Sequence, residues 1–153
     1  MKCIMRQLMK GDRMSRKEKA LELKHQGCNC AQAVALAFED LVDLDEESLL
    51  NLSTGFGAGG GDMSGTCGAL SAVYLLNGLI IGKKYKDDPS KKGKIMTANK
   101  TIAGLFREKN KEVICNKLKG IDTGEVLRSC DGCVEDAAEL LENYLKENNL
   151  LAF

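Results

Sequence analysis

Apolar residues recur at helical spacing along most of the chain, and residues that start or stop helices flank each run. The clearest case is the last segment, whose apolar positions follow i, i+3, i+4 spacing: Val134, Ala137, Ala138, Leu141 and Leu145. No run alternates between apolar and polar residues as a half-buried strand would. The pattern predicts an all-α protein with helices near residues 17–26, 30–41, 45–52, 67–83, 90–109, 111–119 and 131–148.

The most apolar stretch, residues 69–81, is shorter than the ~20 residues that a membrane span needs. It therefore predicts a buried core helix and no membrane span. Small residues at positions 68, 72, 78 and 82 are spaced one turn apart in pairs, which lets another backbone approach closely. We expect this helix to be the most buried one, and Gly78→Leu to overpack it. The predicted fold is a single-domain helical bundle with a buried, glycine-rich central helix.

Residues 1–14 are interpreted as an N-terminal extension, and residues 15–153 as one helical domain. Ser15 followed by Glu18 is a capping-box pattern that opens a helix directly after Met14. Two interpretations of the extension remain open. Met14 is the natural start and the preceding residues are a wrongly assigned leader, or those residues form a short ordered helix. Under either interpretation we expect residues 1–13 to be dispensable for folding.

Charge and aromatic content argue against a nucleic-acid partner. Lys+Arg and Asp+Glu both number 22, aromatic residues make up 5%, and Trp is absent. A nucleic-acid-binding face would be strongly basic, and a single-strand platform would offer aromatic rings for stacking. The single histidine, His25, has no evident partner in the sequence and is interpreted as a surface or capping residue.

Seven cysteines are the outstanding feature, and no secretory signal is visible in the first residues. An odd number of cysteines without such a signal favours a reducing, cytoplasmic location. In that compartment cysteines more often serve metal or redox chemistry than structural disulfides.

Several cysteines fall at predicted helix N-termini: Cys30, Cys67, and the Cys130-Asp-Gly-Cys133 pair. Free N–H groups and the helix dipole stabilise a thiolate there, and the thiolate is both the nucleophile and the metal ligand. Cys115 is predicted inside a helix. The cluster from Gly55 to Gly61 is interpreted as a flexible loop that lets the backbone pass close to Cys67. Buried cysteines that act as small apolar residues, and a zinc site, remain alternatives.

The cysteines stand in an order that resembles a known family. The order is Gly-Cys-Asn-Cys-Ala-Gln-Ala-Val at 27–34, then Gly59-Gly-Gly, then Cys67-Gly-Ala, then Cys115, then Cys130 before an alanine-rich helix. It is similar to that of the redox-active proteins named for their C…GCAxxG…C…C pattern, over nearly the whole chain from Met14 onward. Ala72 stands where the family has its final glycine.

The resemblance implies that Cys30, Cys67, Cys115 and Cys130 are the redox or metal-binding residues, with Cys28 and Cys133 as substitutes. It implies thiol/disulfide electron transfer or ligation of an iron–sulfur cluster. The family is also similar to an iron–sulfur-holding domain of certain multihaem cytochromes. The alternative is a non-catalytic zinc-binding or structural module, so whether the protein is an enzyme stays open. We expect a redox partner protein, and a homodimer is compatible with the sequence.

Overall fold

The computed structural model describes residues 14–151, and these fold into eight α-helices and two short 3-10 turns. The helices are α1 Arg16–His25, α2 Cys30–Ala37, α3 Glu46–Thr54, α4 Gly57–Gly60, α5 Gly68–Ile81, α6 Lys91–Asn110, α7 Cys115–Lys119 and α8 Cys130–Glu147. The 3-10 turns are η1 Glu39–Leu41 and η2 Tyr85–Asp87. The all-α prediction is confirmed. The predicted extension lies almost wholly outside the described residues.

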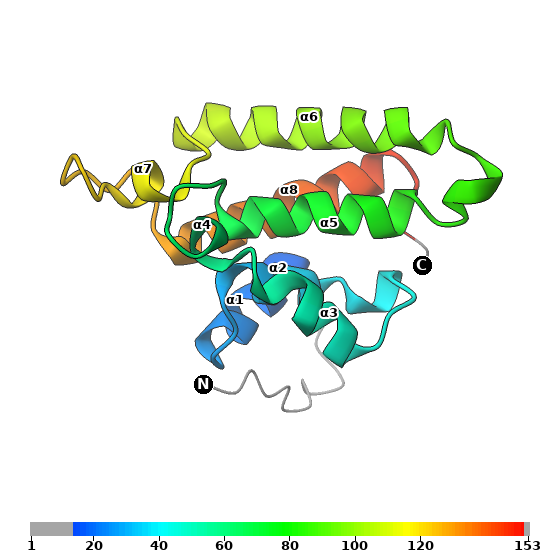
Figure 1. Ribbon diagram of the computed structural model, residues 1–153, viewed down its shortest axis with the longest axis horizontal. Coiled ribbons are helices and arrows are strands. Elements are labelled where there is room, and N and C mark those ends of the chain that lie inside the picture. Colours follow the sequence, from blue (N-terminus) through cyan, green and yellow to red (C-terminus); the bar gives the residue numbers. More distant parts are fainter. Residues whose placement is uncertain (1–13, 152–153) are drawn as a thin grey trace.

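The helices form tiers (Figure 1). α6 lies on one side, α5 and α8 form the middle, and α1, α2 and α3 lie on the other side. α2 packs against both middle helices and carries α3 on its outer side, while α1 packs against α2 and α8. The short helices α4 and α7 lie together at one end of the bundle. In the described part of the chain, no helix is both long and apolar enough to cross a membrane.

Side-chain caps fix several of the helix starts. Ser15 and Asn29 each form a complete capping box, with Glu18 and Gln32 as the reciprocal partners. Ser129 accepts a hydrogen bond from the Gly132 N–H, so α8 begins at Cys130, one residue earlier than predicted. Each cap satisfies N–H groups that have no partner inside the helix.

The helix predicted over 30–41 ends early. Phe38 leaves the helical region at φ −117°, and residues 39–41 continue as a 3-10 turn. The Phe38 side chain is fully buried. α2 is therefore short, which allows the chain to turn towards α3.

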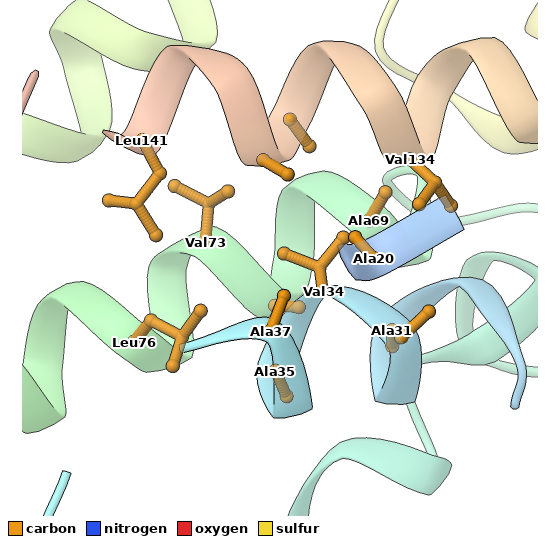
Figure 2. Close-up of a cluster of buried hydrophobic side chains, with 14 of the residues drawn as sticks. Ala20, Ala31, Val34, Ala35, Ala37, Ala69, Val73, Leu76, Val134 and Leu141 are labelled. Atoms are coloured by element: carbon orange, nitrogen blue, oxygen red, sulfur yellow. The ribbon is translucent and has the colours of Figure 1, made fainter. Parts of the chain in front are cut away.

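Alanine and branched apolar residues dominate the core between α2, α5 and α8, as Figure 2 shows for Ala31, Val34, Val73, Val134 and Leu141. α5 is central and buried, as predicted. It is not the most buried helix, however, because six of the eight residues of α2 are buried against eight of the fourteen in α5. Alanines let α2 approach both of its neighbours closely, and that leaves little of its surface in solvent.

The close approach predicted at Gly78 is wrong. A Cβ added there meets no atom within 4 Å, because this part of α5 faces open space. The crowded glycine of α5 is instead Gly68, at the end of the helix that carries Cys67.

Candidate functional site

The glycine cluster is a defined left-handed turn at the end of the bundle. Ala58 and Gly59 have φ of 50° and 60°, and positive φ continues through Gly60 and Gly61. A Cβ on Gly59 would lie 2.7 Å from the Cβ of Cys115, so only glycine fits against that residue. The segment predicted as a flexible loop therefore packs directly on a predicted site cysteine.

Backbone hydrogen bonds tie this turn to a distant part of the chain. The Cys67 N–H donates to the Val113 carbonyl at 2.7 Å, and the Cys115 N–H donates to the Gly65 carbonyl at 2.9 Å. Thr66 and Ile114 form an antiparallel bridge between these contacts. The bridge holds residues 113–114 extended, so α7 begins at Cys115. The prediction that Cys115 lies inside a helix is therefore wrong, and Cys115 is at a helix start like the other three.

Five free cysteines line one pocket of about 190 Å³. They come from the N-terminal ends of four helices: Cys30 of α2, Cys67 before α5, Cys115 of α7, and Cys130 and Cys133 of α8. The other lining residues are Lys24, Asn29, Ala58, Gly68, Leu118, Lys119 and Arg128. The structure thus brings together the four cysteines of the sequence prediction and one of the two predicted substitutes, Cys133, whereas Cys28 does not line the pocket.

Cys67 and Cys133 are joined by a hydrogen bond between their side chains. The Cys133 thiol donates a hydrogen bond to the Cys67 sulfur, which lowers the pKa of Cys67 to about 7 against the opposing effect of burial. The N–H groups of Leu70 and Ala69, in the first turn of α5, assist. The same hydrogen bond and burial strongly raise the pKa of Cys133. Cys67 is therefore the member of the pair that loses its proton first, while Cys133 remains a thiol.

Cys30 lies against the start of α5. A Cβ on Gly68 would come within 2.6 Å of the Cys30 sulfur and 2.5 Å of the Phe56 carbonyl oxygen, so glycine is needed where these segments meet. Burial raises the pKa of the Cys30 thiol, although the N–H groups of Ala58 and Ala31 point towards its sulfur. Burial likewise raises the pKa of Cys115, although the charge of Lys119 opposes it.

Lys119 is the basic residue most closely associated with the thiols. Its ammonium donates a hydrogen bond to the Cys130 sulfur. Burial lowers the pKa of Lys119, but its interactions with Cys130, Cys115 and Cys30 together raise it. The other two basic lining residues are paired with carboxylates. Lys24 contacts Asp131 at 2.8 Å, and Arg128 donates to Asp136 at 3.0 and 3.1 Å.

A buried carboxylate supports the wall of the pocket. Asp136, one turn after Cys133, has a side chain that is 2% exposed and also accepts hydrogen bonds from Lys109 and Asn110 at the end of α6. Burial would raise the pKa of Asp136, but these bonds and those from Arg128 together lower it. The network fixes Arg128 beside the thiols and joins α6 to α8.

Two other residues from the sequence prediction lie apart from the thiols. Cys28 is buried in the core and does not line the pocket. His25 is exposed as interpreted, but it does have a partner, because its Nε2 lies 2.8 Å from Asp131 of the Cys130–Cys133 motif. Among residues 14–151, no three His, Cys, Asp or Glu side chains are placed to share one metal ion.

Sequence reasoning missed Lys119, Arg128 and Asp136. Lys119 could have been found, because it lies four residues after Cys115 in a predicted helix and so on the same face. No comparable sequence signal identifies Arg128 and Asp136, because their ion pair joins a residue that precedes α8 to a residue inside it.

Comparison with known proteins agrees with the resemblance. The family model described as "Putative redox-active protein (C_GCAxxG_C_C)" matches residues 28–144, a range that contains all five pocket cysteines. No curated protein and no solved structure matches the chain. Because the family model covers well over half of the sequence, the chain belongs to this C_GCAxxG_C_C family of redox-active proteins.

Proposed function

We propose that this protein transfers electrons by thiol/disulfide exchange, with Cys67 and Cys133 as the reacting pair. The observation that carries the proposal is the hydrogen bond between their sulfurs, inside a pocket lined by three further thiols. A thiolate attacks a disulfide far faster than a thiol does, and Cys67 is the cysteine whose thiolate is stabilised by its neighbours.

The reaction is a two-electron exchange with an external disulfide. The disulfide accepts two electrons and two protons and becomes two thiols, while Cys67 and Cys133 give up two electrons and form one S–S bond. The Cys133 thiol supplies one of the two protons, and solvent supplies the other. Because the Cys133 thiol donates to the Cys67 sulfur, the two sulfurs already face each other inside the pocket. The partner is therefore expected to be a protein or small molecule that carries a disulfide.

Disulfide mapping tests this proposal. Reduced protein is equilibrated anaerobically in buffers of graded ratios of dithiothreitol and its oxidised form, then alkylated, digested and analysed by mass spectrometry. We expect the Cys67 and Cys133 peptides to become linked over one two-electron transition, and the Cys67→Ser and Cys133→Ser variants each to lose that transition. Oxidation that links neither residue to the other contradicts the proposal.

An iron–sulfur cluster is the second candidate, because the pocket gathers thiols from four helices around one space. Thiolates are the ligands that such clusters require. Cys30, Cys67, Cys115 and Cys130 would hold the cluster, with Cys133 as a substitute, and the cluster would supply one-electron transfer. Anaerobic purification with iron and sulfide analysis tests this. Brown protein with both elements supports the cluster, bound zinc supports a metal-binding module, and colourless metal-free protein with titratable thiols supports exchange.

A further inference from the structure

The cysteines that line the pocket differ in how far their side chains are exposed to solvent. Cys30 and Cys130 are partly exposed, whereas Cys67 and Cys133 are 6% and 3% exposed. Thiol/disulfide exchange needs the attacking sulfur to approach the disulfide in the line of its S–S bond, so access limits the rate. A bulky disulfide therefore meets Cys30 or Cys130 before it can meet the buried pair.

Cys130 is the better placed of the two accessible thiols. It is the first residue of α8, and Lys119 donates a hydrogen bond to its sulfur. Cys133 lies three residues later, so both side chains lie on the same face of the helix. A group held on Cys130 is thus one helical turn from a member of the buried pair.

Cys30 lacks these features. Its sulfur is wedged against the backbone at Gly68, where even a methyl group does not fit. Burial disfavours its thiolate, and Lys119 acts on Cys30 through its charge whereas it donates a hydrogen bond to the Cys130 sulfur. We therefore expect Cys30 to attack an external disulfide more slowly than Cys130.

We propose that Cys130 is the outer thiol, which exchanges with the disulfide of an incoming partner and passes the oxidation to the Cys67–Cys133 pair, with Lys119 as its positioning residue. This inference rests on the proposed function. It identifies the point of contact with the partner, and it explains why the chain carries a third reactive thiol beside a pair that could store two electrons alone.

Each step balances. The Cys130 thiolate attacks R–S–S–R′, forms Cys130–S–S–R and releases R′–S⁻, which takes a proton from solvent. The Cys67 thiolate attacks the Cys130 sulfur, forming Cys67–S–S–Cys130 and releasing R–S⁻. Cys133 gives its proton to R–S⁻ and attacks the Cys67 sulfur, which forms Cys67–S–S–Cys133 and regenerates the Cys130 thiolate. The sum is one external disulfide reduced and one internal disulfide formed.

Trapping the mixed disulfide tests the order of events. Reduced wild-type protein is mixed with 2-hydroxyethyl disulfide, quenched with acid at early times and mapped by mass spectrometry. We expect the hydroxyethylthio group on Cys130 before the Cys67–Cys133 link appears, and its accumulation on Cys130 in a Cys67→Ser/Cys133→Ser double variant. An adduct first seen on Cys30, Cys67 or Cys133 overturns the proposal. The wild-type measurement stands even if the double variant does not fold.

The kinetics separate this inference from the function on which it rests. In Cys130→Ser, the Cys67–Cys133 disulfide should still form at equilibrium, but about tenfold or more slowly with 2-hydroxyethyl disulfide, because direct access to the pair is poor. An unchanged rate overturns the role of Cys130 and leaves the proposed function intact. If wild-type protein never forms the Cys67–Cys133 disulfide, the proposed function itself fails.

The role of Lys119 has a matched control in Lys117, on the same helix but paired with Glu112 and outside the pocket. In Lys119→Met, transfer of the hydroxyethylthio group from 2-hydroxyethyl disulfide to Cys130 should be several-fold slower at pH 7, and Lys119→Arg should restore the rate by keeping a charged hydrogen-bond donor. Lys117→Met should leave the rate unchanged. Equal rates in Lys119→Met and wild type overturn the positioning role.

Discussion

The body of the bundle and its cysteine end are built in different ways. In the body, α2, α5 and α8 pack through alanine and branched apolar side chains, many of them fully buried. At the cysteine end, four consecutive residues, 58–61, have positive φ, and backbone hydrogen bonds join residues 65–67 to residues 113–115. The body thus depends on apolar volume, and the cysteine end on where individual backbone atoms lie.

This difference means that stability and thiol reactivity should respond to different substitutions. Apolar burial is non-directional, so the body should tolerate changes that conserve volume. The cysteine end aims N–H groups and one thiol proton at particular sulfurs, so a shift of one segment changes the chemistry. The predictions below test that separation, from the largest expected effect to the smallest.

Leu141→Ala should have the largest effect on stability. Leu141 is fully buried between helices of the body (Figure 2), and such truncations cost about 2–5 kcal/mol in the free energy of unfolding. Urea unfolding measures this cost, and the volume-conserving control Leu141→Met should lose less than about 1.5 kcal/mol. The rate at which iodoacetamide modifies Cys67 in the folded protein should not change. A changed rate would show that the body and the cysteine end are coupled.

Asp136→Asn should break the junction between the two regions, at a cost of about 1.5–3 kcal/mol at pH 7, because a buried carboxylate loses charged hydrogen-bond partners. The pKa of Asp136 is lowered in the folded protein. Its contribution is therefore present above the unfolded pKa, roughly 3.9, and is lost as pH falls through the lower folded value.

Wild type and Asp136→Asn should therefore converge in stability in strong acid, which urea titrations at several pH values can follow. The control is Glu139→Gln, since Glu139 makes a half-exposed pair with Lys17. That variant should lose no more than about 1 kcal/mol. If the difference in unfolding free energy between wild type and Asp136→Asn stays constant from pH 7 to pH 2, the negative charge of Asp136 does not contribute to stability.

Gly68→Ala and Gly78→Ala form a matched pair on α5. At Gly68 the added methyl group meets Cys30 and Phe56, so the variant should lose about 1–3 kcal/mol and change the reactivity of the pocket thiols. At Gly78 the methyl group meets open space, so the variant should gain about 0.5–1 kcal/mol from the better helix propensity of alanine. If the two substitutions change the free energy of unfolding equally, the body and the cysteine end do not differ in how they respond to added volume.

Cys133→Ala should cost less stability than the substitutions above and act mainly on thiol reactivity. It removes the thiol that donates to Cys67, so the pH midpoint of Cys67 alkylation should rise from about 7 towards the ordinary thiol range. Because the pKa of Cys67 is lowered by folding, its thiolate stabilises the protein above the unfolded thiol pKa, and that contribution fades as pH falls through about 7. An unmoved midpoint would mean that the helix N–H groups alone hold the thiolate.

The sequence by itself determined the helical class, most helix boundaries and which four cysteines to expect together, and all four line the pocket. These follow from local information: apolar spacing in α8, capping boxes at Ser15 and Asn29, and the order of cysteines that resembles the family. Helix periodicity and caps act over one or two turns, so they are legible in a short window of sequence. Local signals also gave a start for α8 that was right to within one residue.

Only the tertiary structure decided how the cysteines are arranged. The Cys133 thiol donates a hydrogen bond to the Cys67 sulfur, although the two residues are 66 positions apart in the sequence. Cys115 is the first residue of α7, and its N–H donates a hydrogen bond to the carbonyl oxygen of Gly65 in a distant segment. The same holds for crowding, since Gly68 is tightly enclosed and Gly78 is open although both sit in the same small-residue pattern. Such contacts depend on which distant segments pack together, and the residues next to a given position in the sequence do not specify that packing.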